Sequence, residues 1–130
     1  MAKRSSTEHG ERSSISLEDL FLKHQSGQVV VIDARHPWFF HRGHIAGATN
    51  VPSDEEFEPD ALIATRLEKW KSAIAEGKTL VVYCDGLLCS DARTVSRAIS
   101  KQGLDVSVFG GGWEAWKKAN LPIESTSQEP

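Results

Sequence analysis

The 130-residue chain is poor in cysteine and has no long apolar run. Its two cysteines, Cys84 and Cys89, cannot form the framework of several disulfides that holds small secreted domains together, so we expect a reduced, cytoplasmic protein. Their separation of five residues still permits one local disulfide. No stretch is apolar over a length sufficient to span a bilayer. The N-terminal residues include basic side chains without an apolar segment after them, which is not the pattern of a secretory signal.

The sequence also lacks a strong charge imbalance. Its formal net charge of -3 gives no reason to expect nucleic acid or an anionic membrane as a partner. Hydrophobic residues make up 39% of the chain and charged residues 25%, as is typical of soluble globular proteins. The length corresponds to one domain with a core of its own.

Short apolar runs alternate with helical patterns along the chain. Residues 29–32 and 80–83 have the composition of strands buried on both faces, and residues 106–109 add a further strand. Helices are predicted to begin at Ser16, at Pro37, at Pro59, at Ser90 or Asp91, and at Trp113. This order predicts an α/β fold with a central, mostly parallel sheet and helices on both faces.

Polar segments without periodicity stand at both ends of the chain. We expect residues 1–13 and 125–130 to be disordered tails, with the folded domain covering residues 14–124.

Cys84 follows directly on the strand predicted for residues 80–83. Helix N-termini and curled loops supply N–H groups that bind anions and favour a thiolate over a thiol, so this thiol has the position of a nucleophile. The alternative is a small apolar filler of the core, which is the usual role of a free cysteine. Asp33 follows the strand 29–32 in the same way, and both side chains can share the crevice where such sheets bind ligands. The residues that surround the thiol in the sequence are Asp85, Gly86, Leu87, Leu88, Cys89 and Ser90.

Several sequence motifs together resemble the rhodanese family of sulfurtransferase domains, over roughly residues 14 to 124. They are VIDAR at 31–35, GHIAGA at 43–48, NVP at 50–52, VYC at 82–84 and GGGW at 110–113, followed by Trp116 and by LP at 121–122. The resemblance implies a rhodanese-like fold whose cysteine accepts a sulfane sulfur as a persulfide and passes it on. By position, that cysteine is Cys84. The reaction needs no metal or organic cofactor, and no Cys/His cluster supplies metal ligands.

The loop after Cys84 departs from the family pattern. The best-known members carry a basic residue there, often Arg, that helps to hold thiosulfate. This chain has Asp85, which opposes thiolate formation and repels a dianion, while Leu87 and Leu88 offer an apolar lip to a thiol or a protein. Arg93 either swings back to supply charge or points to solvent. This departure argues against thiosulfate as the donor, so the partners we expect are another small sulfur donor, a thiol acceptor or a protein sulfur carrier.

Other candidate residues have two interpretations each. Cys89 is either a resolving thiol that bonds to Cys84 or a helix-entry cysteine packed under the loop, and we favour the second. Asp33 and Arg35 are expected to form a partly buried ion pair. His44 is expected to bond to backbone between two turns, with a role as catalytic base as the alternative. Trp38 is a candidate for the rim of the site.

Two other functions compete with sulfur transfer. A phosphatase or arsenate reductase on a related scaffold needs a cysteine and an arginine six residues apart, and position 90 is Ser. A non-catalytic interaction module would keep the fold without the activity. The intact Cys84 argues against this module, and the acidic, apolar loop argues for it.

Overall fold

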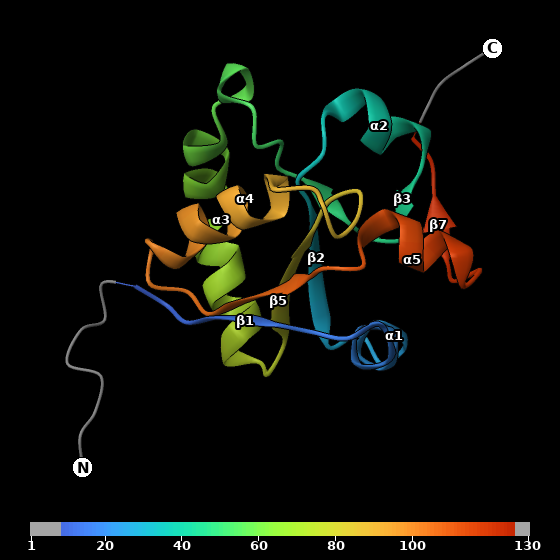
Figure 1. Cartoon of the computed structure of the whole chain (residues 1–130). Coiled ribbons are helices and arrows are strands. Elements are labelled where there is room, and N and C mark those ends of the chain that lie inside the picture. Colours follow the sequence, from blue (N-terminus) through green and yellow to red (C-terminus); the bar gives the residue numbers. More distant parts are fainter. Residues whose placement is uncertain (1–8, 127–130) are drawn as a thin grey trace.

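The computed structural model describes residues 9–126 and places a five-stranded sheet at its centre (Figure 1). All strand pairs in this sheet are parallel. The strand order is β1 (Arg12–Ser14), β6 (Val106–Phe109), β5 (Thr79–Tyr83), β2 (Val29–Asp33) and β4 (Thr49–Asn50). A separate antiparallel pair joins β3 (His44–Ile45) to β7 (Ile123–Glu124). The predicted fold class is confirmed.

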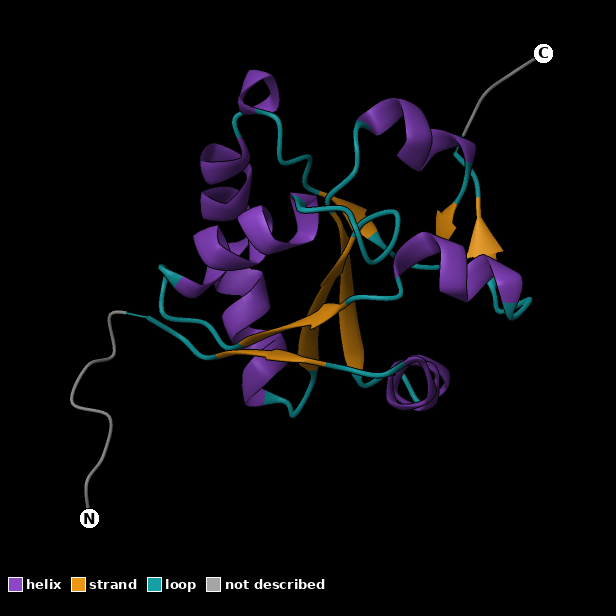
Figure 2. Ribbon diagram, in the orientation of Figure 1, coloured by secondary structure: helices purple, strands orange, loops and turns teal. Residues whose placement is uncertain are grey.

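Helices cover both faces of the sheet (Figure 2). One face packs against α3 (Pro59–Ala75) and α4 (Asp91–Ser100), and the other packs against α1 (Leu17–Gln25) and α5 (Gly112–Lys118). The short helix α2 (Pro37–Arg42) and the 3-10 turn η1 (Glu55–Phe57) lie in the connections that follow β2 and β4.

Side chains of the central strands point alternately to the two faces of the sheet and pack into two separate hydrophobic cores. Val82 of β5 packs with Trp70 of α3, whereas Val81 and Tyr83 pack with Trp116 of α5. All of these side chains are buried. Because successive residues of a strand point to opposite faces, a strand between two helical layers must be apolar throughout. This requirement explains the continuous apolar runs of β2 and β5.

The helices begin at residues whose chemistry suits a helix start. The Ser16 hydroxyl accepts a hydrogen bond from the Asp19 amide at 3.1 Å and caps α1 as predicted. Pro37 and Pro59 occupy the first positions of α2 and α3. Proline suits this position because a backbone N–H there would have no acceptor within the helix.

Both tails are shorter than the sequence predicts. Residues 12 and 13 belong to β1, which pairs with β6, although this exposed edge strand of three residues has no hydrophobic alternation to reveal it. At the other end, the Ser125 hydroxyl and the Thr126 amide donate to the carbonyl oxygen of His41 at 3.1 and 3.0 Å. The rest of the predicted tails, residues 1–8 and 127–130, lies outside the described residues. None of the helices within 9–126 has the length and apolarity needed to cross a membrane.

Candidate active site

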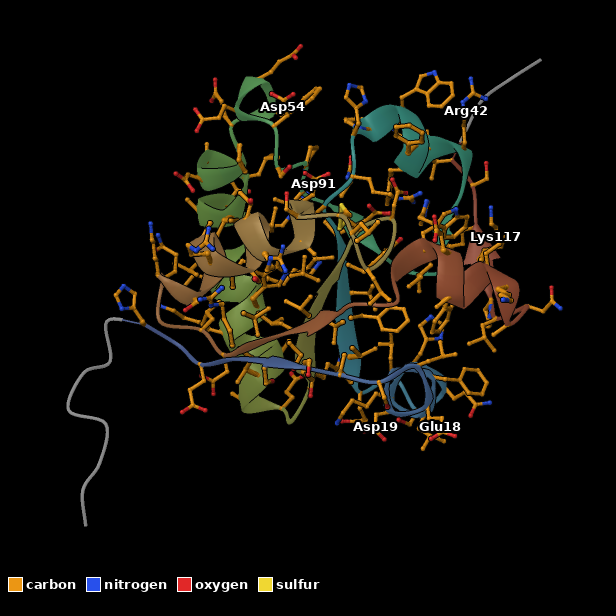
Figure 3. All side chains as sticks on the ribbon, viewed as in Figure 1. Glu18, Asp19, Arg42, Asp54, Asp91 and Lys117 are labelled. Atoms are coloured by element: carbon orange, nitrogen blue, oxygen red, sulfur yellow. A yellow bond between two sulfur atoms is a disulfide. The ribbon has the colours of Figure 1, made fainter. Side chains whose placement is uncertain are left out.

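The carboxyl ends of β2 and β5, where the sequence predicts a crevice shared by Asp33 and Cys84, lie side by side, but the pocket at this edge is lined by neither residue. These strands are hydrogen-bonded neighbours, and Asp33 at the end of β2 is in register with Tyr83 at the end of β5. Cys84 is the next residue, so its backbone leaves the sheet beside Asp33. A loop then leads from Cys84 to the start of α4 at Asp91, labelled in Figure 3.

Cys84 and Cys89 form a disulfide, with their Cα atoms 6.4 Å apart (Figure 3). The loop folds back on itself because the Cys89 amide donates to the Gly86 carbonyl oxygen at 3.1 Å. Cys84 is 2% exposed, whereas Cys89 is half-buried. The favoured interpretation of Cys89 as an unbonded cysteine under the loop is therefore wrong, and the bond is the local disulfide that the spacing permits. The turn at Gly86 brings two thiols together that sequence spacing alone only allowed to meet.

Both sulfur atoms lie at the N-terminus of α4. The Ala92 amide donates to Cys84 Sγ at 3.3 Å, and the Asp91 amide donates to Cys89 Sγ at 3.4 Å. The Ser90 side chain makes no capping bond, so sulfur takes the place of the predicted Ser cap. One amide reaches each sulfur, rather than several reaching Cys84 as the sequence suggested. When the disulfide is reduced, an N–H donor and the positive end of a helix favour the Cys84 thiolate.

A buried charge network supports the base of the loop. Arg35 Nη2 donates to Asp33 Oδ2 at 2.7 Å and to the Gly43 carbonyl oxygen at 2.6 Å, and Tyr83 donates its hydroxyl proton to Asp33 Oδ2 at 2.5 Å. The predicted Asp33–Arg35 pair is present, and it is fully rather than partly buried. Burial and the neighbouring Asp33 carboxylate raise the pKa of Tyr83 far above its ordinary value. Burial lowers the pKa of Arg35, but the hydrogen bond and charge of Asp33, together with Tyr83 and Asp85, outweigh burial, so the net pKa is raised.

Arg35 also faces the acidic residue of the loop. Its Nη1 lies 3.8 Å from Asp85 Oδ1, and its guanidinium stacks over the Trp113 ring with Cζ 4.8 Å from the centroid. The positive charge that the sequence lacks inside the loop is thus supplied from β2's end, where it partly offsets Asp85. Nothing in the local sequence around Cys84 shows this contact.

The start of α5 holds the first two loop residues by their backbone. The Trp113 amide donates to the Cys84 carbonyl oxygen at 2.8 Å, and the Glu114 amide donates to that of Asp85 at 2.9 Å. Gly112 has φ +63°, and a Cβ on it would lie 2.5 Å from the Cys84 oxygen. Only glycine allows so close an approach of two backbones. The GGGW motif therefore serves to position the cysteine.

A pocket of about 640 Å³ opens beside the disulfide. Leu87 and Leu88, at its rim, are 80% and 100% exposed. Besides these two, its lining comprises Asp85, Gly86, Cys89, Gly111, Glu114, Ala115 and Lys118. The pocket thus joins Cys89 to an apolar lip and to charges of both signs. Cys84 is buried behind it.

A family model of the Rhodanese-like domain matches residues 16–119 of this chain. The chain belongs to the Rhodanese-like domain family. Rhodanese-related solved structures share its fold, among them one from Thermoplasma volcanium with a TM-score of 0.58 and 26% sequence identity, covering 86% of this chain and 97% of that chain.

Two other proteins that are similar to this chain have different descriptions. An HTH-type transcriptional regulator of Mycobacterium tuberculosis is 28% identical over 111 residues, which are 85% of this chain and 44% of that protein. A solved Rhodopseudomonas palustris protein, described as a possible tyrosine phosphatase, has a TM-score of 0.59 and 28% identity, covering 86% of this chain and 84% of that chain. The chain spans about half the length of the curated relatives it matches.

Other candidate residues of this rhodanese-like domain lie outside the pocket lining. His44 is buried, stacks on Phe40 with centroids 3.8 Å apart, and its Nδ1 lies 2.7 Å from the Phe40 carbonyl oxygen, as a backbone-bonding role requires. Trp38 is exposed and stacks with Arg42, whose Cζ is 3.9 Å from the ring centroid. Arg93 is exposed on the first turn of α4.

Metal ligation finds no support in the described residues. Across 9–126, no three His, Cys, Asp or Glu side chains converge as a metal ion would need.

Proposed function

We propose that the reduced chain accepts a sulfane sulfur on Cys84 as a persulfide and passes it to a thiol. The observation that supports this most is the position of Cys84 Sγ, 3.3 Å from the Ala92 amide at the start of a ten-residue helix. That position favours a thiolate, and it stabilises negative charge on sulfur without rearrangement of the protein.

The transfer step conserves charge and oxidation state. The Cys84 thiolate attacks the terminal sulfur of a donor persulfide, a new S–S bond forms, and the donor's S–S bond breaks. The donor leaves as a thiolate, which takes a proton from water. The product is a persulfide on Cys84, and an acceptor thiolate removes its outer sulfur by the same step in reverse.

The loop favours a persulfide donor over thiosulfate. Asp85 and Glu114 line the pocket with negative charge, and Lys118 is the one cation among its lining residues. Thiosulfate carries two negative charges, and the Asp85 carboxylate repels it. Leu87 and Leu88 offer instead an exposed apolar surface to an organic persulfide or to a persulfidated protein.

The disulfide requires that the chain be reduced before any assay. Cys84 is 2% exposed and bonded to Cys89 in this state, so no Cys84 thiolate is present to react with a sulfur donor. We expect reduction to release Cys89 and the loop around it. The decisive measurement is the intact mass of the Cys89→Ser variant after reduction, removal of the reductant and exposure to glutathione persulfide, thiosulfate or a persulfidated cysteine desulfurase.

We expect a gain of one sulfur atom that is absent from Cys84→Ala, with glutathione persulfide more effective than thiosulfate. No gain from any donor would contradict sulfur transfer and favour the non-catalytic interaction module. Hydrolysis of an aryl phosphate by the reduced chain would instead favour a phosphatase. That activity is not expected, because Ser90 stands where a phosphatase needs the arginine that grips its oxyanion.

A further inference from the structure

The two cysteines of the chain are bonded to each other within the loop that carries the proposed nucleophile. Sulfur transfer through Cys84 alone gives Cys89 no role. A thiol that bonds directly to the nucleophile can instead end the reaction by displacement. Cys89 is therefore a thiol at the site that the proposed function leaves unused.

We propose that Cys89 is the resolving thiol of a reductive cycle, in which the chain converts sulfane sulfur delivered to Cys84 into free sulfide and ends as the Cys84–Cys89 disulfide. This activity rests on the proposed function, because it begins from the Cys84 persulfide. It makes the protein a reductase for sulfane sulfur, with low-molecular-weight persulfides as the substrate class and a dithiol as the reductant.

The resolving step balances in atoms and electrons. The Cys89 thiol loses its proton to water and attacks Cys84 Sγ, forming the bond present in the structure. The bond between Cys84 Sγ and the outer sulfur breaks, and that sulfur leaves as HS⁻ with the persulfide proton. Two thiol sulfurs are oxidised to a disulfide, while the sulfane sulfur gains two electrons and becomes sulfide.

Geometry favours attack on the inner sulfur over attack on the outer one. The Cα atoms of the two cysteines are 6.4 Å apart, within the range that a direct disulfide requires, so Cys89 Sγ can reach Cys84 Sγ. The Gly86 to Cys89 turn holds the two residues in this arrangement. Attack on the outer sulfur would only move the persulfide from one cysteine to the other and release nothing.

Regeneration of the reduced chain requires an external dithiol, and the two cysteines differ in their accessibility to this reductant. Cys89 is half-buried and lines the 640 Å³ pocket, whereas Cys84 is buried and is not part of that lining. A dithiol therefore attacks Cys89 Sγ, and Cys84 leaves as the thiolate that accepts from the Ala92 amide. The second thiol of the reductant then releases Cys89. This order restores the nucleophile in its charged form.

The test is a single turnover without external reductant. The wild-type chain, Cys89→Ser and Cys84→Ser are reduced with a phosphine, desalted and mixed with one equivalent of glutathione persulfide. Released sulfide is trapped with a bimane reagent, and intact masses are measured under non-reducing conditions. The two single variants carry the same substitution on either thiol and are matched controls for each other. Cys89→Ala repeats the first variant with a different side chain.

For the wild type we expect one equivalent of sulfide and a protein mass lower than that of the reduced chain by two hydrogen atoms. The rate should not change when glutathione is added, since the attacking thiol is internal. Cys89→Ser and Cys89→Ala should keep the added sulfur and release sulfide at least about 100-fold more slowly, because an intramolecular thiol has a high effective concentration. Cys84→Ser should neither gain sulfur nor release sulfide.

Each outcome that contradicts these expectations shows whether the proposed function fails or only the resolving role of Cys89. If neither Cys89 variant gains sulfur, the proposed function fails, and this inference fails with it. If they gain sulfur but the wild type keeps its sulfur equally long, Cys89 does not resolve and sulfur transfer alone stands. Sulfide release that rises in proportion to added glutathione also overturns the resolving role. Persulfide that accumulates on Cys84→Ser would overturn the assignment of the two thiols.

Discussion

Replacing Gly112 by Ala tests whether the GGGW motif positions the cysteine. Gly112 has φ +63°, and an added Cβ would lie 2.5 Å from the Cys84 carbonyl oxygen and 2.7 Å from the Asp85 carbonyl carbon. Both are backbone atoms, so no flexible side chain can yield. We expect two costs, one from the left-handed conformation and one from the contact with the loop.

The matched control is Gly27→Ala. Gly27 has φ +72°, and an added Cβ there would meet nothing within 4 Å. The left-handed conformation costs an L-residue about 1–2 kcal/mol at either position, and the change in the unfolded chain is the same for both. Forcing extra atoms into a packed site costs about 1–3 kcal/mol more. The free energy of unfolding should therefore fall by about 1–3 kcal/mol more in Gly112→Ala than in Gly27→Ala.

Urea unfolding of the reduced proteins, followed by tryptophan fluorescence, measures this difference. The slope of the unfolding free energy against urea should be unchanged, which shows that the native state has kept its compactness. Sulfur uptake by Cys84 should slow in Gly112→Ala and stay at the parent rate in Gly27→Ala, both measured in the Cys89→Ser background. Equal losses of stability in the two variants would refute the reasoning, because the contact with Cys84 would then cost nothing.

Three further predictions concern Asp33, Tyr83 and Asp85. Asp33→Asn should lower the free energy of unfolding by about 3 kcal/mol, because it leaves Arg35 buried without its main partner. Tyr83 is the only tyrosine of the chain, so tyrosinate absorbance should be absent from the folded protein at pH values where the denatured chain ionises, near the ordinary pKa of 10.0. Since the folded pKa is the higher one, this group's contribution to stability is complete below that pH and is lost as the pH rises above it. Asp85→Asn should speed sulfur uptake from thiosulfate about fivefold, the effect of roughly 1 kcal/mol of repulsion between charges about 4 Å apart in bulk water, and speed uptake from glutathione persulfide less.

Each of these predictions has its own control. Asp60→Asn, an exposed carboxylate at the start of α3, should change stability by less than about 0.5 kcal/mol. A loss below about 1 kcal/mol in Asp33→Asn would contradict the importance of the buried pair. Tyr83→Phe must remove the tyrosinate signal altogether, and a folded-state signal near pH 10 would disprove the raised pKa. Equal acceleration with both donors would show that Asp85 does not select against the dianion.

The fold could be predicted from the sequence because its main signals are local. Continuous apolar runs mark β2 and β5, and Ser16 and Pro37 mark helix starts within one residue of their positions. The strands β1, β3 and β7 were missed because each has two or three residues and is defined only by its partner. Arg12 pairs with Val106, which is 94 residues away in the sequence, and neither segment alone has a pattern that indicates this pairing.

The site was predictable only in part, for a similar reason. The position of Cys84 after a strand and before a helix is a local pattern, and so is the pair of Asp33 and Arg35. The bond from Cys84 to Cys89 depends on how the Gly86 turn closes, which spacing permits but does not decide. The link from Arg35 to Asp85 spans 50 residues and exists only because β2 and β5 are neighbours in the sheet.

The last described residues have a consequence for choosing a recombinant boundary. The matched family segment stops at residue 119, yet the Trp116 indole donates to the Pro122 carbonyl oxygen at 2.7 Å, and the Gly47 amide donates to Glu124 Oε1 at 2.9 Å. Thr126 then bonds to His41. An expression clone trimmed to the family segment would cut away these acceptors and leave the buried Trp116 N–H unpaired. Clones intended for crystallisation or kinetics should therefore extend at least through residue 126.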